Sequence, residues 1–281
     1  MESPSKKSRS SPPLSTCAHA PLKAWLASLS EACTRAELGL DHVLVRADPH
    51  GGVGLFAAQP IAPGAVAFMV PRAAVVSPQV VNADPTVGLG GALAAYPYPF
   101  RAALWLARAR HDRTHAFHAF ARALPAAAPN APWWPAPSRA WLRGSNLGFA
   151  CDAARASLAA QWAAAGSQAA LAAQPHSTAA LGAASQAVAG LALADVQWGA
   201  GVYDSRRLPL RLSGASVGKA ASDDYGPATG EGVLVPLLDF GNHHAAAKVR
   251  KYTRDGDVSI LLACCCCCCC CWWWWWWWWW W

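Results

Sequence analysis

The spacing of apolar residues along the chain predicts elements of two kinds. Helical spacing begins behind Pro21, a residue favoured in the first turn of a helix, and it indicates an amphipathic helix over residues 21–33. After residue 41 the pattern changes to short β-rich runs separated by turns rich in glycine and proline, which predicts a small antiparallel sheet. These runs are residues 42–45, 54–58 and 65–70.

Helical patterns fill the middle of the chain, and β-rich runs return near its end. Residues 100–123 have apolar positions at helical spacing, and residues 152–195 are rich in alanine, which has a high helix propensity. A loop rich in proline and tryptophan, residues 125–137, separates them. The later β-rich runs are residues 208–212, 233–238 and 258–262. We therefore predict an α+β chain in which two β-rich ends enclose a helical insert over residues 80–195.

The last segment, residues 264–281, does not follow any globular pattern. It consists of eight consecutive cysteines followed by ten consecutive tryptophans. Zinc ligands are separated by short loops, so an unbroken run of cysteines does not make a structural zinc site. We interpret this low-complexity tail as a triplet repeat translated past a true exon end, and we expect the informative sequence to stop at Ala263. Outside the tail, the cysteines are too few for a disulfide-rich scaffold.

Charge and hydropathy exclude several other classes of protein. The net charge of +7 comes from 23 basic and 16 acidic residues, and the only basic cluster lies in the head, residues 1–20, so no nucleic-acid partner is expected. Outside the tail, no apolar stretch is long enough to predict a membrane span. The head lacks the apolar region of a secretory signal, and we expect it to be disordered. We expect a monomer, with the chloroplast, the cytoplasm and the nucleus all open as compartments.

Two motifs have an ordinary structural interpretation. The glycines around Gly51 and Gly52 lack the spacing of a dinucleotide-binding fingerprint, so a hairpin turn is favoured over a loop whose backbone lies against a ligand. His111, His115 and His118 could share one helix face, but no carboxylate or cysteine is placed to complete a zinc site. A solvated helix face is favoured there, and no metal is expected.

The segment of residues 234–244 is more informative. An apolar run around Pro236 leads into Asp239, Asn242 and His243, so a buried segment delivers polar groups to an internal junction. Asparagine and histidine side chains can hydrogen-bond an adenine edge or a carboxylate. A capped turn with satisfied polar groups explains the same pattern equally well.

These motifs together resemble a SET domain. Residues 50–58, followed by residues 61–64 and a run that ends at Pro71, resemble its opening, and residues 234–243 resemble its asparagine–histidine motif. The segments between them resemble, in order, the helical insert of the Rubisco large-subunit methyltransferase branch; they are residues 103–106, 117–125, 141–145 and 198–208. The resemblance implies that residues 21–263 form a SET domain whose C-terminal part is missing.

The resemblance implies methylation of a protein side chain, usually a lysine amine, with S-adenosylmethionine as cofactor and without a metal. It implies backbone contacts to the cofactor from Gly51, Gly52 and Val53, and contact between Arg206 and the methionine carboxylate. The resemblance also implies that Asn242 and His243 contact the adenine and the amine, with Asp239 and Phe240 flanking them. A protein-histidine methyltransferase and a non-catalytic SET-like binding module remain as alternatives.

The sequence departs from the family pattern in three places. Phe240 and Gly241 replace larger residues, Leu208 stands where an aromatic residue is common, and the pattern ends at Ala263. In the family, the part that follows supplies a tyrosine that lines the lysine channel. Tyr252 is a candidate for that tyrosine by its distance from Asn242, although a surface position on a strand is favoured. We therefore expect the chain as written to be an incomplete enzyme whose substrate stays open.

Overall fold

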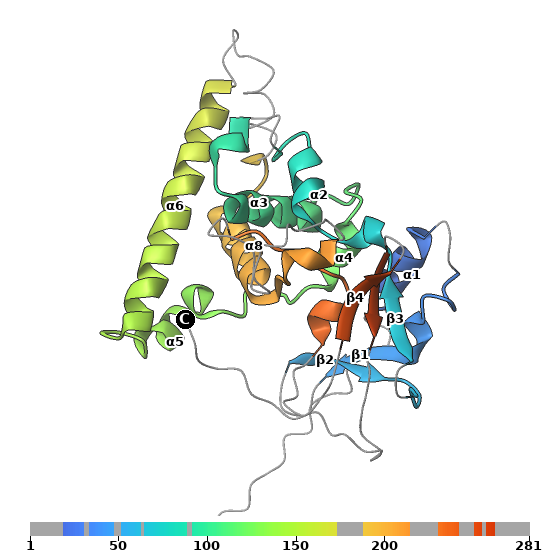
Figure 1. Cartoon of the computed structure of the whole chain (residues 1–281). Coiled ribbons are helices and arrows are strands. Elements are labelled where there is room, and N and C mark those ends of the chain that lie inside the picture. Colours follow the sequence, from blue (N-terminus) through green and yellow to red (C-terminus); the bar gives the residue numbers. More distant parts are fainter. Residues whose placement is uncertain are drawn as a thin grey trace, which may run out of the picture.

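The computed structural model describes nine segments of the chain, which are residues 19–30, 34–47, 52–62, 65–88, 92–172, 188–213, 230–241, 250–254 and 257–261. Within them, helices and two small sheets pack on one continuous hydrophobic core, so the predicted α+β class is confirmed. Figure 1 shows the sheets gathered on one side of the insert helices, with the long helix α6 along the opposite edge. No helix in these segments is both long and apolar enough to cross a membrane.

The β-rich runs near the start of the chain lie in two sheets. The strands β1 (Val43–Ala47) and β2 (Val53–Ala57) form an antiparallel hairpin, whereas β3 (Val66–Val70) pairs with β5 (Asp257–Leu261). The strand β4 (Arg250–Arg254) completes a second sheet of order β3-β5-β4. The expectation of one antiparallel sheet was therefore wrong, because β3 takes its partner from the far end of the chain.

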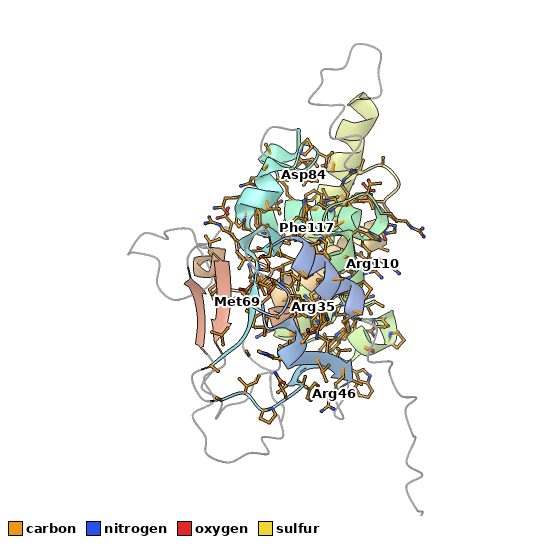
Figure 2. The ribbon with its side chains drawn as sticks, turned by 90° about the vertical axis from the view of Figure 1, so that its right-hand side faces the viewer. Arg35, Arg46, Met69, Asp84, Arg110 and Phe117 are labelled. Atoms are coloured by element: carbon orange, nitrogen blue, oxygen red, sulfur yellow. The ribbon has the colours of Figure 1, made fainter. Side chains whose placement is uncertain are left out.

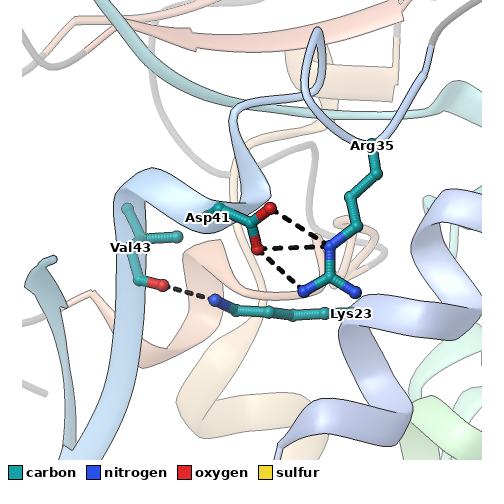
Figure 3. Close-up of polar contacts among 4 residues, drawn as sticks. All are labelled: Lys23, Arg35, Asp41 and Val43. Atoms are coloured by element: carbon teal, nitrogen blue, oxygen red, sulfur yellow. Dashed lines mark hydrogen bonds and ion pairs between the residues drawn. The ribbon is translucent and has the colours of Figure 1, made fainter.

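The first helix is tied to the hairpin by buried contacts. Helix α1 (Ala20–Ser28) begins with Pro21 in its first turn, as predicted, and buries Leu22 and Leu26. The Nζ atom of Lys23 donates to the carbonyl oxygen of Val43 at the start of β1 (Figure 3), and burial lowers the pKa of this lysine. Beside it Arg35 pairs with Asp41 on the surface (Figure 3), with Nη2 2.7 Å from Oδ1.

The insert consists of helices that extend from Pro78 to Arg206, compared with the predicted range of residues 80–195. The longer helices are α3 (Tyr98–His111), α6 (Asn146–Ala172) and α8 (Leu193–Arg206). The shorter helices are α2 (Pro78–Ala83), α4 (His118–Ala123) and α5 (Ala136–Ala140), with 3-10 turns at η3 (Ala92–Ala95) and η4 (Ala131–Trp133). The 3-10 turn η2 (Arg72–Ala74) precedes the insert. Figure 2 shows Phe117 among these helices and Met69 on β3 at the sheet side.

The helix predicted over residues 100–123 is interrupted by a turn. The Oδ1 atom of Asp112 accepts hydrogen bonds from both the backbone N–H and the hydroxyl of Thr114, at 2.8 and 2.6 Å. Such a turn satisfies the backbone locally and competes with the helix. The chain therefore ends α3 at His111 and starts again as α4 at His118.

Helices α3 and α8 form the centre of the core. Trp105 of α3 and Tyr203 of α8 are almost completely buried. The two backbones approach closely at Gly199, where an added Cβ atom would lie 2.2 Å from the carbonyl oxygen of Ala103. Because the C-terminal end of α8 carries Arg206, this packing fixes the position of the candidate site.

Two of the predicted late strands are not strands. Leu208 and Val233 form an isolated bridge, and Leu234 bridges Val76. The chain then turns through η5 (Leu210–Ser213) in the first case and η6 (Leu238–Phe240) in the second. Pro209 and Pro236 interrupt these runs, and a proline has no N–H to donate to a neighbouring strand. The run at residues 258–262 does form a strand, β5.

Candidate cofactor-binding site

Three elements meet at the candidate site, which are the C-terminal end of α8, the turn η6 and the strand β2. Helix α8 supplies Arg206, η6 supplies Asp239 and Phe240, and β2 contacts η6. The structure thus brings Arg206 into contact with Asp239 and Phe240. It also places β2, which begins with Val53 directly after Gly52, against η6. Gly51, Asn242 and His243 lie outside the described residues, so their predicted roles stay predictions.

Arg206 contacts two residues of η6, Asp239 and Phe240. Its Nη1 atom donates to the carbonyl oxygen of Asp239 at 2.6 Å and to the Oδ2 atom of the same residue at 3.0 Å. Its guanidinium carbon lies 5.0 Å from the centre of the Phe240 ring, within cation–π range. Arg206 therefore has a carboxylate partner within the chain, in addition to the ligand carboxylate that the resemblance implies.

The ion pair is buried and only partly satisfied. The side chain of Arg206 is 15% exposed and that of Asp239 is 0% exposed. The Nε atom of Arg206 and the Oδ1 atom of Asp239 are buried without a hydrogen-bond partner among the described residues. A buried donor or acceptor left unpaired costs about 1 to 3 kcal/mol. The site therefore contains one buried donor and one buried acceptor that no described residue satisfies.

Burial also changes the acidity of Asp239. The loss of solvent around the carboxyl group raises the pKa of Asp239 to about 6, although Arg206 favours the charged form. At neutral pH the carboxylate is ionised and paired with Arg206, and a modest drop in pH protonates it.

Leu237 precedes η6 in a strained conformation. Its φ of 67° lies in the left-handed region, and no other non-glycine residue in the described segments has a positive φ. Such a conformation costs on the order of 1 to 3 kcal/mol and persists where the surrounding structure enforces it. Complete burial of the Leu237 side chain provides that constraint, and the turn directs Asp239 toward Arg206. Sequence reasoning missed Leu237, because leucine carries no signal for this conformation.

His19 is a second residue that sequence reasoning missed. Its ring lies edge-on to Phe240 with centroids 5.1 Å apart, and its Nδ1 atom is buried without a partner in the described part of the chain. Burial lowers the pKa of His19. No motif marks this histidine, since it lies in the predicted head and reaches the site only when α1 packs against the core.

The start of β2 offers an open backbone edge. Gly52 has a φ of 78°, as a glycine in a hairpin turn was expected to have, and an added Cβ atom would meet nothing within 4 Å. Val53 follows it with 38% of its surface exposed, which is unusual for a large apolar residue in this protein. Both interpretations of the glycine motif are compatible with this geometry, because a hairpin turn with open space beside it can also receive a ligand.

Tyr252 lies in β4, in register with Ser259 of β5, and the description of β4 covers only its backbone. The strand part of the favoured interpretation is therefore observed, and a surface position of its side chain stays a prediction. A role in a lysine channel stays a prediction.

The three spaced histidines do not share a helix face, because the turn at Asp112 separates them. The Nε2 atom of His111 lies 2.8 Å from the Oδ1 atom of Asp195, and the Nδ1 atom of His118 lies 2.9 Å from the carbonyl oxygen of Ala109. His115 packs edge-on against Trp105. Across the described segments, no group of three or more histidine, cysteine, aspartate or glutamate residues is arranged to hold a metal ion.

Solved structures place this geometry in a known fold. The SET domain of LSMT bound to lysine and AdoHcy superposes with a TM-score of 0.63 at 17% identity, and the match covers 89% of this chain and 51% of that one. The chain has a SET-domain fold. Rubisco LSMT bound to AdoMet matches with a TM-score of 0.61 at 19% identity over 88% of this chain and 49% of that one.

A third match, Rubisco LSMT bound to sinefungin and monomethyllysine, has a TM-score of 0.61 at 18% identity and covers 89% of this chain and 49% of that one. The chain therefore spans about half the length of the SET structures that it matches. No family model matches the sequence, and no curated protein matches it. Identities this low establish the SET fold alone.

Proposed function

We propose that this protein is an S-adenosylmethionine-dependent protein methyltransferase that acts on a lysine amine. The observation that carries the proposal is the unpaired Nε donor of Arg206 beside the unpaired Oδ1 acceptor of Asp239. An amino-acid group presents a carboxylate and an ammonium group close together, which would satisfy both atoms. S-adenosylmethionine carries such a group, and LSMT, whose fold this chain resembles, is seen with AdoMet bound.

The described residues fit the cofactor in three respects. Arg206 would bind its carboxylate by a charge-assisted hydrogen bond, and Asp239 would accept a hydrogen bond from its ammonium group. The open backbone beside Gly52 would allow close approach of the rest of the cofactor, since among the described residues no atom lies within 4 Å of where a Cβ atom would stand. Asn242 and His243 complete the proposed site through the adenine and amine contacts implied by the motif.

In this reaction the main task of the protein is to position the two reacting groups. When bound, S-adenosylmethionine would supply an already electrophilic methyl group. The protein must hold a neutral amine in line with it, and correct alignment can supply much of the rate. Exclusion of water from the amine's surroundings lowers the pKa of a lysine and favours its nucleophilic form. The buried apolar side chains of Leu237 and Phe240 would help to exclude water there.

Cofactor binding is the first test of the proposal. Arg206→Ala should weaken the binding of S-adenosylmethionine by roughly 5- to 150-fold, since it removes one partner of a buried charged hydrogen bond. Asn242→Ala should weaken it similarly. Isothermal titration calorimetry measures both changes.

Arg207→Ala is the matched control, because Arg207 also donates to a backbone carbonyl, that of Gly230 at 2.7 Å, yet makes no contact with η6 among the described residues. It should bind the cofactor within about twofold of the unmutated chain. Thermal unfolding checks that each variant is folded. If the unmutated protein binds no cofactor at millimolar concentration, the proposal fails.

The acceptor residue needs a separate experiment. Transfer of a tritiated methyl group to lysate proteins, followed by mapping of the labelled residue, distinguishes lysine from histidine. The protein translated from the full transcript should be used alongside this chain. Cofactor binding by both without any transfer would favour a non-catalytic SET-like module.

A further inference from the structure

A second pocket lies in the helical insert, between α3, α4 and α8. Its volume is about 360 Å³, and its polar lining consists of Arg110, His111, Arg122 and Asp195. Trp198 forms an apolar wall. Figure 2 shows Arg110 on the insert side of the molecule, apart from Arg46 on β1. The proposed methyl transfer uses none of these residues.

Helix α8 separates this pocket from the candidate cofactor site. Asp195 lies in the first turn of α8, and Arg206 is its last residue. With a rise of about 1.5 Å per residue, these positions are about 16 Å apart along the helix axis. The two sites are therefore distinct and share one rigid element.

Arg110 is held in a fixed orientation in the pocket. Its guanidinium carbon lies 4.2 Å from the centre of the Trp198 ring, and the Trp198 ring is anchored by a 2.7 Å hydrogen bond from Nε1 to the carbonyl oxygen of Pro125. The Nη1 and Nη2 atoms of Arg110 are 3.5 and 3.4 Å from the carbonyl oxygen of Ala126. This acceptor is neutral, and the carboxylate that favours the charged form of Arg110 is Asp195 of the same pocket.

The carboxylate in the pocket, that of Asp195, already has two partners. Asp195 accepts a hydrogen bond of 2.8 Å from the backbone N–H of Ala192, and its other oxygen lies 2.8 Å from the Nε2 atom of His111. Arg122 is exposed and makes no hydrogen bond or ion pair within the described segments. Partial burial and then the positive charge of Arg122 lower the pKa of Arg110, whereas the carboxylate of Asp195 opposes this change. Two guanidinium groups thus repel each other in one pocket, and the carboxylate of that pocket, Asp195, already contacts His111 and Ala192.

We propose that this pocket binds an oxyanion, either a carboxylate of an acidic protein segment or a phosphate group. Guanidinium groups bind both kinds of oxyanion through paired hydrogen bonds, and stacking on an aromatic ring uses the face of the guanidinium while leaving its edge for an acceptor. An anion between Arg110 and Arg122 relieves their repulsion, which gives the pocket a preference for negative ligands. The proposal rests on the insert alone and stands independently of methyl transfer.

Isothermal titration of the full chain with inorganic phosphate and, separately, with a hexaglutamate peptide tests this site. Arg110→Gln and Arg122→Gln should each weaken binding by about tenfold, as expected for the loss of one charge-assisted hydrogen bond. Arg143→Gln is the matched control, because Arg143 is exposed, carries the same charge and lies outside the pocket. This control should change affinity by less than about twofold.

The outcomes separate the possible sources of the anion. Binding of the peptide with competition by phosphate supports an acidic protein segment, and binding of phosphate alone supports a phosphate ligand. Equal weakening by Arg143→Gln overturns the proposal, since binding then follows net charge, and so does the absence of binding by either probe. Arg122→Gln decides the result if Arg110→Gln fails to fold, because the exposed Arg122 contributes nothing to the core.

Discussion

At the scale of single residues, Asp239 is the most constrained group in the candidate site. Its carboxyl group is completely enclosed and has one partner, Arg206, for two oxygens. Because burial disfavours the charged carboxylate more than Arg206 favours it, the pKa of Asp239 rises from 3.8 to about 6. A group of this kind makes the stability of the folded protein depend on pH.

Asp239→Asn should remove that dependence. A carboxyl group whose pKa is raised by folding binds its proton more tightly in the folded state, so its stabilising contribution is complete below the unfolded pKa of 3.8 and is lost as the pH rises through 6. Relative to the variant, the unmutated chain should lose about 3 kcal/mol of unfolding free energy between about pH 4 and pH 7.

Chemical denaturation of both proteins across this range measures the difference. The test compares how the unfolding free energy of each protein changes with pH. The absolute difference between the two proteins is not informative, because the amide introduced by Asp239→Asn also changes the pairing of Arg206 at every pH. Parallel profiles would mean that Asp239 ionises normally and that its surroundings are wetter than the structure indicates.

At the scale of elements, the contact between α3 and α8 determines where Arg206 lies. The helices approach closely because Gly199 presents no side chain to Ala103. A glycine inside a helix is unfavourable by about 1 kcal/mol relative to alanine, so its presence there reflects the packing requirement. Gly166 in α6 provides a comparison, since an added Cβ atom would meet nothing within 4 Å.

These two glycines should respond to alanine in opposite directions. Gly199→Ala should destabilise the protein by about 1 to 3 kcal/mol or more, because the methyl group would overlap the carbonyl of Ala103 and force the helices apart. Gly166→Ala should stabilise it by up to about 1 kcal/mol through helix propensity.

Urea unfolding measures the free energy of both variants. The titration with S-adenosylmethionine described above should also show weaker binding for Gly199→Ala, since displacement of α8 moves Arg206. Similar stability changes for the two variants would contradict the close approach of α3 and α8.

At the scale of the whole molecule, α8 carries one proposed site at each end. The anion pocket surrounds its first turns, and the cofactor site adjoins its last residue. A ligand that binds only the folded state stabilises it, so each site can be followed through thermal unfolding.

Saturation of each site should raise the unfolding midpoint independently. At one hundred times its dissociation constant, S-adenosylmethionine should add about 2.7 kcal/mol, which corresponds to an increase of roughly 5 to 10 °C for a chain of this size. Arg206→Ala should reduce this shift and leave the shift produced by phosphate unchanged, whereas Arg122→Gln should do the reverse. Differential scanning calorimetry provides the midpoints. Loss of both shifts in either variant would show that the sites are coupled or that one of them is misassigned.

Local features of the fold were predictable from sequence, because they depend on neighbouring residues. Pro21 marks the first turn of α1, and Gly52 has the positive φ expected in a hairpin turn. Periodicity also predicted the α+β class and the helical insert. Arg206, Asp239 and Phe240 were singled out by their motifs, which record residue types in order, and the structure brings these three together.

Partners distant in sequence were decided only by the tertiary structure. The pairing of β3 with β5, the link between Arg206 and Asp239 across 33 positions, and the contact of His19 with Phe240 have no local signature. The same holds for the strained φ of Leu237 and for the pocket around Arg110. Hydrophobic periodicity states which face of an element is buried, but not which other element covers it. Burial, charge pairing and pKa all depend on that second choice, and for this reason the chemistry of both proposed sites emerged only when the elements were packed together.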